Sequence, residues 1–364
     1  MLAQQPSGGS GYDWTMALLS SWFVGGLFLD GWAHRHISEL ETFFTPWHAV
    51  FYAGFLALAG FLLAVLVRNH ANGYPWRRAM PPGYELAILG VLVFMAGGVA
   101  DMIWHEIFGI ETDVEALLSP THLLLATGMT LIISTPWRAG WRRRVDQHDP
   151  APGWGALLPQ LLALTFVWSV WSFFTQFAHP LVDTWAAAAY RPPGSRGLMF
   201  LRMSLGIASF LLQTALMMGL VLLTVRRWTL PLGGLSLAFG LNATLMSFMQ
   251  DQYLLIPAAM LAGLVSDLLI RWLKLSMARS GALRLFAFAV PVVYYTLYYV
   301  ILIMTRGLEW SVHVWTGSIV LSGVVGLLLS YVLIPPLSPP PQAGSLRASS
   351  AVEGPSHAEI GGRG

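Results

Sequence analysis

The sequence predicts an all-α fold, a polytopic bundle of about ten transmembrane helices, and three observations carry this prediction. Of the 364 residues, 55% are hydrophobic and only 10% are charged, whereas soluble domains carry roughly 25% charged residues. The apolar residues form runs of about 20, the length that a helix needs to cross the hydrocarbon core. These runs do not alternate with polar residues as membrane β-strands would. Soluble enzymes, disordered chains and nucleic-acid-binding proteins are thereby excluded, and the lipid bilayer is the expected partner.

The spans follow one another along most of the chain. We expect them at residues 14–32, 46–67, 84–105, 119–136, 155–177, 198–225, 229–249, 254–273, 284–304 and 312–334. The polar segment 1–11 and the Pro/Ser/Gly-rich tail 335–364 cannot bury a core, so we expect both to be disordered. Between them the chain divides into a four-helix unit at 12–136, a basic loop at 137–153 and a six-helix region at 154–334.

Arginine placement predicts the orientation. Basic clusters fall in every second loop, at 68–82, at 137–153, at Arg226 and Arg227, and between Lys274 and Arg284. By the positive-inside rule these loops lie in the cytoplasm. We therefore expect a multi-pass protein of the inner (plasma) membrane with both termini cytoplasmic.

Histidine and carboxylate side chains are the only metal-binding groups of note, because the chain has 10 histidines and no cysteine. The absence of cysteine excludes disulfides, thiolate metal sites and cysteine nucleophiles.

Two hairpins in the four-helix unit carry the same series of residue types. Each has an aspartate, a histidine four residues later, a Glu-Thr pair, two large apolar residues, a hydroxyl residue and then Pro-x-His. The matched residues are Asp30, His34, Glu41, Thr45, Pro46 and His48 in the first hairpin, and Asp101, His105, Glu111, Ser119, Pro120 and His122 in the second. Such a match predicts a tandem repeat of a two-helix unit.

The spacing predicts where these side chains lie. An aspartate and a histidine four residues apart share one face of a helix, here at its outer end. Thr45-Pro46 and Ser119-Pro120 have the pattern of an N-cap hydroxyl followed by proline at the first helical position. His48 and His122 therefore fall in the first turn of the returning helices. Each hairpin brings two imidazoles and a carboxylate to the outward face.

We interpret this pattern as a metal site. His34, His48, His105 and His122 are the expected ligands, and Asp30 and Asp101 are ligands or orient the imidazoles. The catalytic candidates are Asp30, Asp101, Glu41 and Glu111, although the Glu-Thr pairs can equally cap a turn. His179 and His313, near Asp183 and Glu309, are further possible ligands without a repeat. The alternative is that the histidines only bond loop backbone and anchor helix ends.

Several metals suit imidazole and carboxylate ligands. Copper and zinc are favoured, and iron and manganese are possible. Haem is less expected, because membrane cytochromes that carry electrons across the bilayer usually have haem ligands at both depths, and the cytoplasmic half of the spans offers none. The Asp30-x3-His34…His48 spacing resembles, over this short stretch, the Asp-x3-His…His metal motif of the copper-dependent membrane monooxygenases. That resemblance implies copper.

The resulting expectation is a metal-dependent membrane enzyme, a hydrolase or an oxidase/oxygenase acting on a lipid-soluble or periplasmic substrate. The alternatives are a metal or small-solute permease, and a redox or assembly component that works with other membrane subunits. The scarcity of charged residues deep in the spans disfavours transport.

Overall fold

A computed structural model describes residues 5–37, 45–109, 113–143, 153–188 and 196–334. Within these residues the chain is a bundle of helices, and its one isolated β-bridge joins Ala187 to Leu308. The predicted tail 335–364 lies outside the described residues. The helices are α1 (Ser10–His36), α2 (Pro46–Ala71), η1 (Trp76–Arg78), α3 (Glu85–Phe108), α4 (Asp113–Leu118), α5 (Pro120–Ile133), α6 (Thr135–Arg142), α7 (Trp154–Phe174), η2 (Gln176–Ala178), α8 (Arg196–Arg227), α9 (Gly234–Phe248), η3 (Tyr253–Leu255), α10 (Ile256–Trp272), α11 (Ser280–Thr305) and α12 (Val312–Leu333).

The predicted helical membrane bundle is confirmed at this level. Eight helices of the described chain are long and apolar enough to cross a membrane, and α5 and α9 are shorter apolar helices. The fourth predicted span, 119–136, is interrupted: Ser134 ends α5, and α6 begins at Thr135 with Pro136 in its first turn. Proline has no N–H to donate, which suits Pro136 to the first turn of α6, where such a donor would have no partner within the helix.

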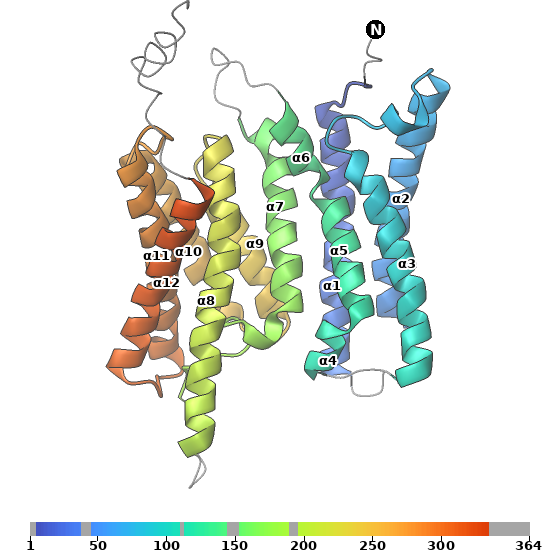
Figure 1. Cartoon of the computed structure of the whole chain (residues 1–364). Coiled ribbons are helices and arrows are strands. Elements are labelled where there is room, and N and C mark those ends of the chain that lie inside the picture. Colours follow the sequence, from blue (N-terminus) through green and yellow to red (C-terminus); the bar gives the residue numbers. More distant parts are fainter. Residues whose placement is uncertain (1–4, 38–44, 110–112, 144–152, 189–195, 335–364) are drawn as a thin grey trace, which may run out of the picture.

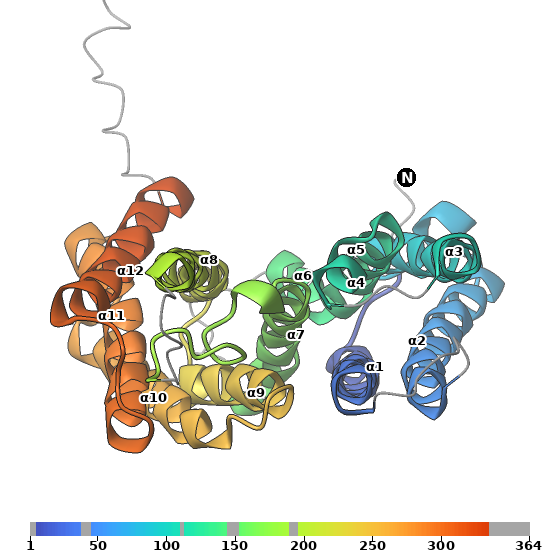
Figure 2. The ribbon, with the colours of Figure 1, turned by 90° about the horizontal axis from the view of Figure 1, so that it is seen from below.

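The helices form two groups joined by α6 and α7. Figure 1 shows α1, α2, α3 and α5 side by side at one edge and α8 to α12 at the other. Seen from below in Figure 2, α1 lies beside α2, and α5 lies beside α3, with the two pairs facing each other. The described chain begins and ends at the same end of the bundle (Figure 1).

Glycines set the distance between the helices of each pair in the same way. A Cβ on Gly26 would lie 2.7 Å from the Phe51 Cα, and one on Gly54 would lie 2.9 Å from the Phe23 Cα. In the other pair, a Cβ on Gly97 would lie 3.1 Å from the Leu125 Cδ2, and one on Gly128 would lie 2.6 Å from the Phe94 nitrogen. These four glycines occupy matched positions in the two hairpins. Small residues allow close helix approach in membranes, where tight packing stabilises association.

The charged residues at the end of the bundle nearest the described chain ends are used in packing. Asp13, 1% exposed, accepts hydrogen bonds from Tyr84, Arg143 and Gln160. Asp267 of α10, which is fully buried, accepts from the first backbone N–H groups of α9, at Leu235 (3.1 Å) and Ser236 (3.2 Å). Buried carboxylates are tolerated when several donors satisfy them. Both aspartates therefore hold helices together.

A buried polar network crosses the second helix group. The Asn242 amide donates to Ser169 and Ser172, and the Ser172 hydroxyl donates to Gln213. The Gln213 amide donates to Thr175 and to the backbone of the loop that follows α7. These bonds attach α7 to α9 and the loop after α7 to α8. None of these side chains is ionisable.

Candidate metal centre

The predicted N-caps place two histidines at the start of returning helices. Thr45 caps α2 by accepting from the His48 backbone N–H at 3.1 Å, and Pro46 occupies the first turn. Ser119 caps α5 by accepting from the His122 backbone N–H at 3.3 Å, with Pro120 in the first turn. Both caps lie where the sequence predicts them.

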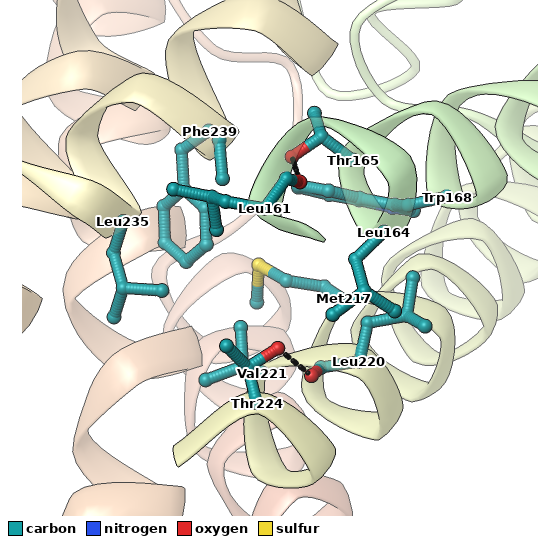
Figure 3. A pocket seen from close by; sticks show the side chains of 11 residues that line it. Leu161, Leu164, Thr165, Trp168, Met217, Leu220, Val221, Thr224, Leu235 and Phe239 are labelled. Atoms are coloured by element: carbon teal, nitrogen blue, oxygen red, sulfur yellow. Dashed lines mark hydrogen bonds between the residues drawn. The ribbon is translucent and has the colours of Figure 1, made fainter. Parts of the chain in front are cut away.

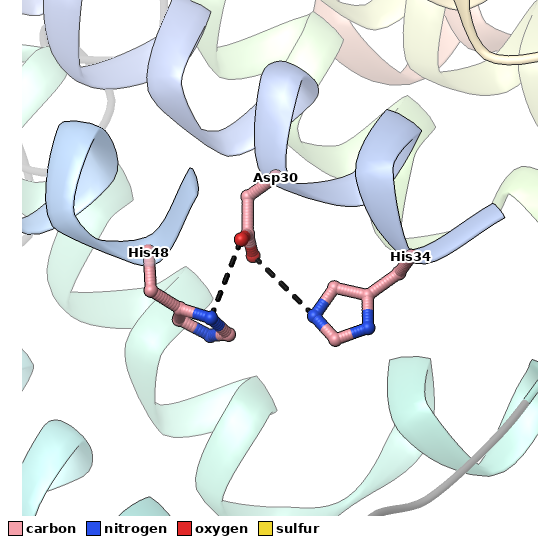
Figure 4. Close-up of side chains that lie close together, drawn as sticks. All are labelled: Asp30, His34 and His48. Carbon is pink, nitrogen blue, oxygen red and sulfur yellow. Dashed lines mark ion pairs between the residues drawn. The ribbon is translucent and has the colours of Figure 1, made fainter. Parts of the chain in front are cut away.

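The first group consists of Asp30, His34 and His48, and Figure 4 shows the carboxylate of Asp30 between the two imidazoles. Asp30 Oδ1 lies 3.3 Å from His48 Nδ1, and Asp30 Oδ2 lies 3.9 Å from His34 Nε2. The two rings stand nearly perpendicular, with centroids 5.5 Å apart. Asp30 is only 9% exposed.

The second group repeats this arrangement with Asp101, His105 and His122. Asp101 Oδ2 lies 3.4 Å from His105 Nε2, and Asp101 Oδ1 lies 3.6 Å from His122 Nε2. The ring centroids are 5.6 Å apart. Asp101 is 1% exposed, and Thr121 donates to its Oδ1 at 2.8 Å.

Hydrogen bonds to the far side of a ring decide which nitrogen faces the carboxylate. His105 Nδ1 lies 3.3 Å from the Gly109 carbonyl oxygen. A carbonyl can only accept, so Nδ1 carries the proton, and the neutral ring presents the lone pair of Nε2 to Asp101. A lone pair and a carboxylate oxygen at 3.4 Å repel each other unless a cation lies between them. That cation is either a proton or a metal ion.

The dimensions of both groups fit a metal ion. Two ligands bound at about 2.0–2.2 Å in a tetrahedral site lie roughly 3.3–3.6 Å apart, close to the Asp–His distances of 3.3–3.9 Å. In each group one atom from every residue lies within 4.8 Å of the others. Within the described residues, Oδ1 of Asp30 is buried and forms no hydrogen bond, although His48 Nδ1 lies 3.3 Å from it. Among the described residues, no lysine or arginine forms an ion pair with either aspartate. The structure thus contains two groups of residues that could hold a metal ion.

The two groups lie close enough to act on each other. His34 interacts electrostatically with His105 and His122, and His48 interacts with Asp101. Phe23 and Phe94, matched residues of α1 and α3, contact each other with 5.0 Å between ring centroids. The facing of the helix pairs in Figure 2 accounts for this proximity.

Two contributing residues were not predicted. Tyr52 stacks on His48, with 6.1 Å between centroids, and lies one helical turn after it. Thr121 supplies the hydrogen bond to Asp101. Their positions in the sequence could have indicated both residues. Tyr52 follows His48 by four residues, and Thr121 lies between Pro120 and His122.

The remaining predicted site residues lie elsewhere. Glu41 and Glu111 fall outside the described residues. His179 is buried in the loop after α7, where its Nδ1 accepts from the Leu181 N–H at 3.1 Å, and burial lowers the pKa of His179 to about 3. His313 is in the first turn of α12. The structure brings neither histidine into the two groups.

A pocket between α7, α8 and α9 is separate from these groups (Figure 3). Its lining is almost wholly apolar, and its two hydroxyls, Thr165 and Thr224, donate to carbonyls of their own helices. It therefore offers no ionisable group for chemistry.

Comparison with known proteins leaves the site to be interpreted from its own geometry. No family model, no curated protein and no solved structure matches the chain.

Proposed function

We propose that this chain is a membrane metalloprotein with its metal centre at the end of the bundle opposite the described chain ends. The observation that carries the proposal is the pair of His₂Asp groups in which acceptor atoms face one another at metal-ligand spacing. Oδ1 of Asp30 supports it, because this buried oxygen faces His48 Nδ1 at 3.3 Å and forms no hydrogen bond within the described residues, and a buried carboxylate without a compensating partner is costly. The alternation of basic loops along the sequence supports an outward, periplasmic location for this end, since the matched motifs fall in the loops between them.

The membrane topology that we propose has ten spans. The eight long apolar helices and the shorter α5 and α9 would each cross the bilayer. The membrane would be the inner (plasma) membrane, with both termini in the cytoplasm. The matched glycine contacts in the two helix pairs support a tandem repeat over the first four spans.

Copper and zinc are the metals that we favour. Two imidazoles and a carboxylate without thiolate suit both ions, and iron or manganese also accept such ligands. Three protein ligands leave at least one position for water or substrate, as in catalytic zinc sites. Glu41 and Glu111, in the loops that enter the two returning helices, remain candidates for proton transfer.

The activity that we propose is metal-dependent catalysis on a lipid-soluble or periplasmic substrate. A bound metal would supply either an activated water for hydrolysis or redox chemistry for oxidation. Asp30 and Asp101 would balance its charge, while Gly109 and Ser119 would orient His105 and His122 through their Nδ1 atoms.

Metal analysis of detergent-purified protein tests the proposal. Wild type should hold two metal ions per chain, His34→Ala/His48→Ala should hold one, and His105→Ala/His122→Ala should also hold one. His70→Ala is the matched control, because His70 bonds the Tyr74 carbonyl and stacks on Trp76 away from both groups. Wild type without stoichiometric metal, or metal content unchanged in both double variants, would refute the proposal.

A permease is the competing function, since the same residues could bind transported metal. Proteoliposomes loaded with a metal-sensitive dye distinguish the two. We expect no flux above that of empty liposomes, and rapid uptake that requires His34 and His122 would replace the enzyme proposal with transport.

A further inference from the structure

Tyr52 lies between the two His/Asp groups. Its ring stacks on His48 of the first group, with 19° between the ring planes. On its other side it faces α3, the helix that carries Asp101 and His105. A Cβ on Gly98 would lie 3.5 Å from the Tyr52 hydroxyl oxygen. Gly98 precedes Asp101 by three residues and so shares its helix face.

Both carboxylates act on this hydroxyl. Tyr52 interacts electrostatically with Asp101 and with Asp30, one from each group. A tyrosine phenol is protonated at neutral pH and can donate one hydrogen bond. The stacking of Tyr52 on His48 and its approach to Gly98 therefore place one hydrogen-bond donor between the helices that carry the two groups.

The second hairpin has no equivalent of this residue. The position that matches Tyr52 is Ala126, which is 1% exposed. The repeat therefore supplies one phenol to the two groups, as a ligand shared between them would need.

We propose that the two groups form a single two-metal centre and that the Tyr52 hydroxyl donates a hydrogen bond to a small anionic ligand shared between the metals. This inference rests on the proposed function. It gives the ligand class as a small oxygen- or nitrogen-donor anion, such as hydroxide or azide, and it makes Tyr52 the residue that positions it. The loss of a hydrogen bond to a charged group costs about 1.5–3 kcal/mol, which corresponds to weaker binding by about tenfold to a hundredfold.

The test uses the full chain in detergent, loaded with Co²⁺ and titrated with azide while visible absorption is recorded. Wild type and Tyr52→Phe should both hold two Co²⁺ per chain, and wild type should bind one azide per chain. Tyr52→Phe should bind azide at least tenfold more weakly. Tyr299→Phe is the matched control, because Tyr299 is a buried span tyrosine bonded to Ser318, and its azide affinity should equal that of wild type.

Substitutions at Gly98 give a second, independent measurement. Gly98→Ala adds only an ordinary 3.5 Å contact and should bind azide as wild type does. Gly98→Leu should push the Tyr52 ring aside and reproduce the weaker binding of Tyr52→Phe.

The possible failures are distinguishable. Two azides per chain with equal affinity, or unchanged azide affinity in Tyr52→Phe, would overturn the shared ligand while the metal centre stands. Wild type without bound Co²⁺ would overturn the metal centre itself.

Discussion

The contact between α1 and α2 gives a sharp test of how helix packing supports the site. Replacement of Gly26 by alanine puts a Cβ 2.7 Å from the Phe51 Cα, whereas ordinary contacts begin near 3.4 Å. The atom it meets is backbone, so the helices must separate by about 0.7 Å or the chain must strain. Gly25→Ala, one residue earlier on the same helix, has nothing within 4 Å.

The two variants share the same gain in helix propensity, about 1 kcal/mol for alanine over glycine. Their difference therefore isolates the overpacking cost, which we expect to be about 1–3 kcal/mol against Gly26→Ala. His48 precedes Phe51 by three residues, so separation of the helices also lengthens its 3.3 Å approach to Asp30. Gly26→Ala should bind metal more weakly, and Gly25→Ala should bind it normally.

Thermal unfolding in detergent, followed by circular dichroism, measures the stability difference, and metal analysis after dialysis measures the affinity. Equal unfolding temperatures and equal metal retention in the two variants would refute the packing argument.

Three further predictions concern the rest of the molecule. Asp267→Ala should destabilise the protein by about 2–3 kcal/mol, because two buried N–H groups lose their acceptor, whereas Glu115→Ala, at an exposed position of α4, should change the thermal unfolding temperature little. Burial lowers the pKa of His179 to about 3, so the unfolded chain binds its proton first as the pH falls below about 6.5. Stability should therefore drop between pH 6.5 and pH 3, by up to about 1.4 kcal/mol per pH unit, and a His179→Gln variant should show a shallower loss in pH-dependent unfolding. Removal of metal with a chelator should lower the unfolding temperature of wild type, because each site loses about 2.7 kcal/mol of stabilisation when metal was present at a hundred times its Kd. A variant without the four repeat histidines should unfold at the same temperature with and without the chelator.

Local rules made the site predictable. The four-residue spacing of Asp30 and His34 and the Thr45-Pro46 cap depend only on helix geometry, and the structure has both. Hydropathy likewise predicted the bundle, although it extended the fourth span to residue 136, past the break at Ser134.

Contacts between helices far apart in the chain could not be predicted from the sequence. Nothing near Asp267 indicates that it caps α9, since its partners are Leu235 and Ser236. The role of Tyr52 depends on Gly98 of another helix. Such pairings are decided by how whole helices pack, and periodicity along one helix does not specify its neighbour.

Each His₂Asp group is complete within one helix pair, and this has a consequence for how the protein is made. Asp30, His34 and His48 all lie before Ala71, and the other three residues lie between Glu85 and Ile133. A nascent chain stopped after α5 already contains every residue of both groups. Metal loading can therefore precede the synthesis of α7 to α12, because these later helices contribute no residue to either group.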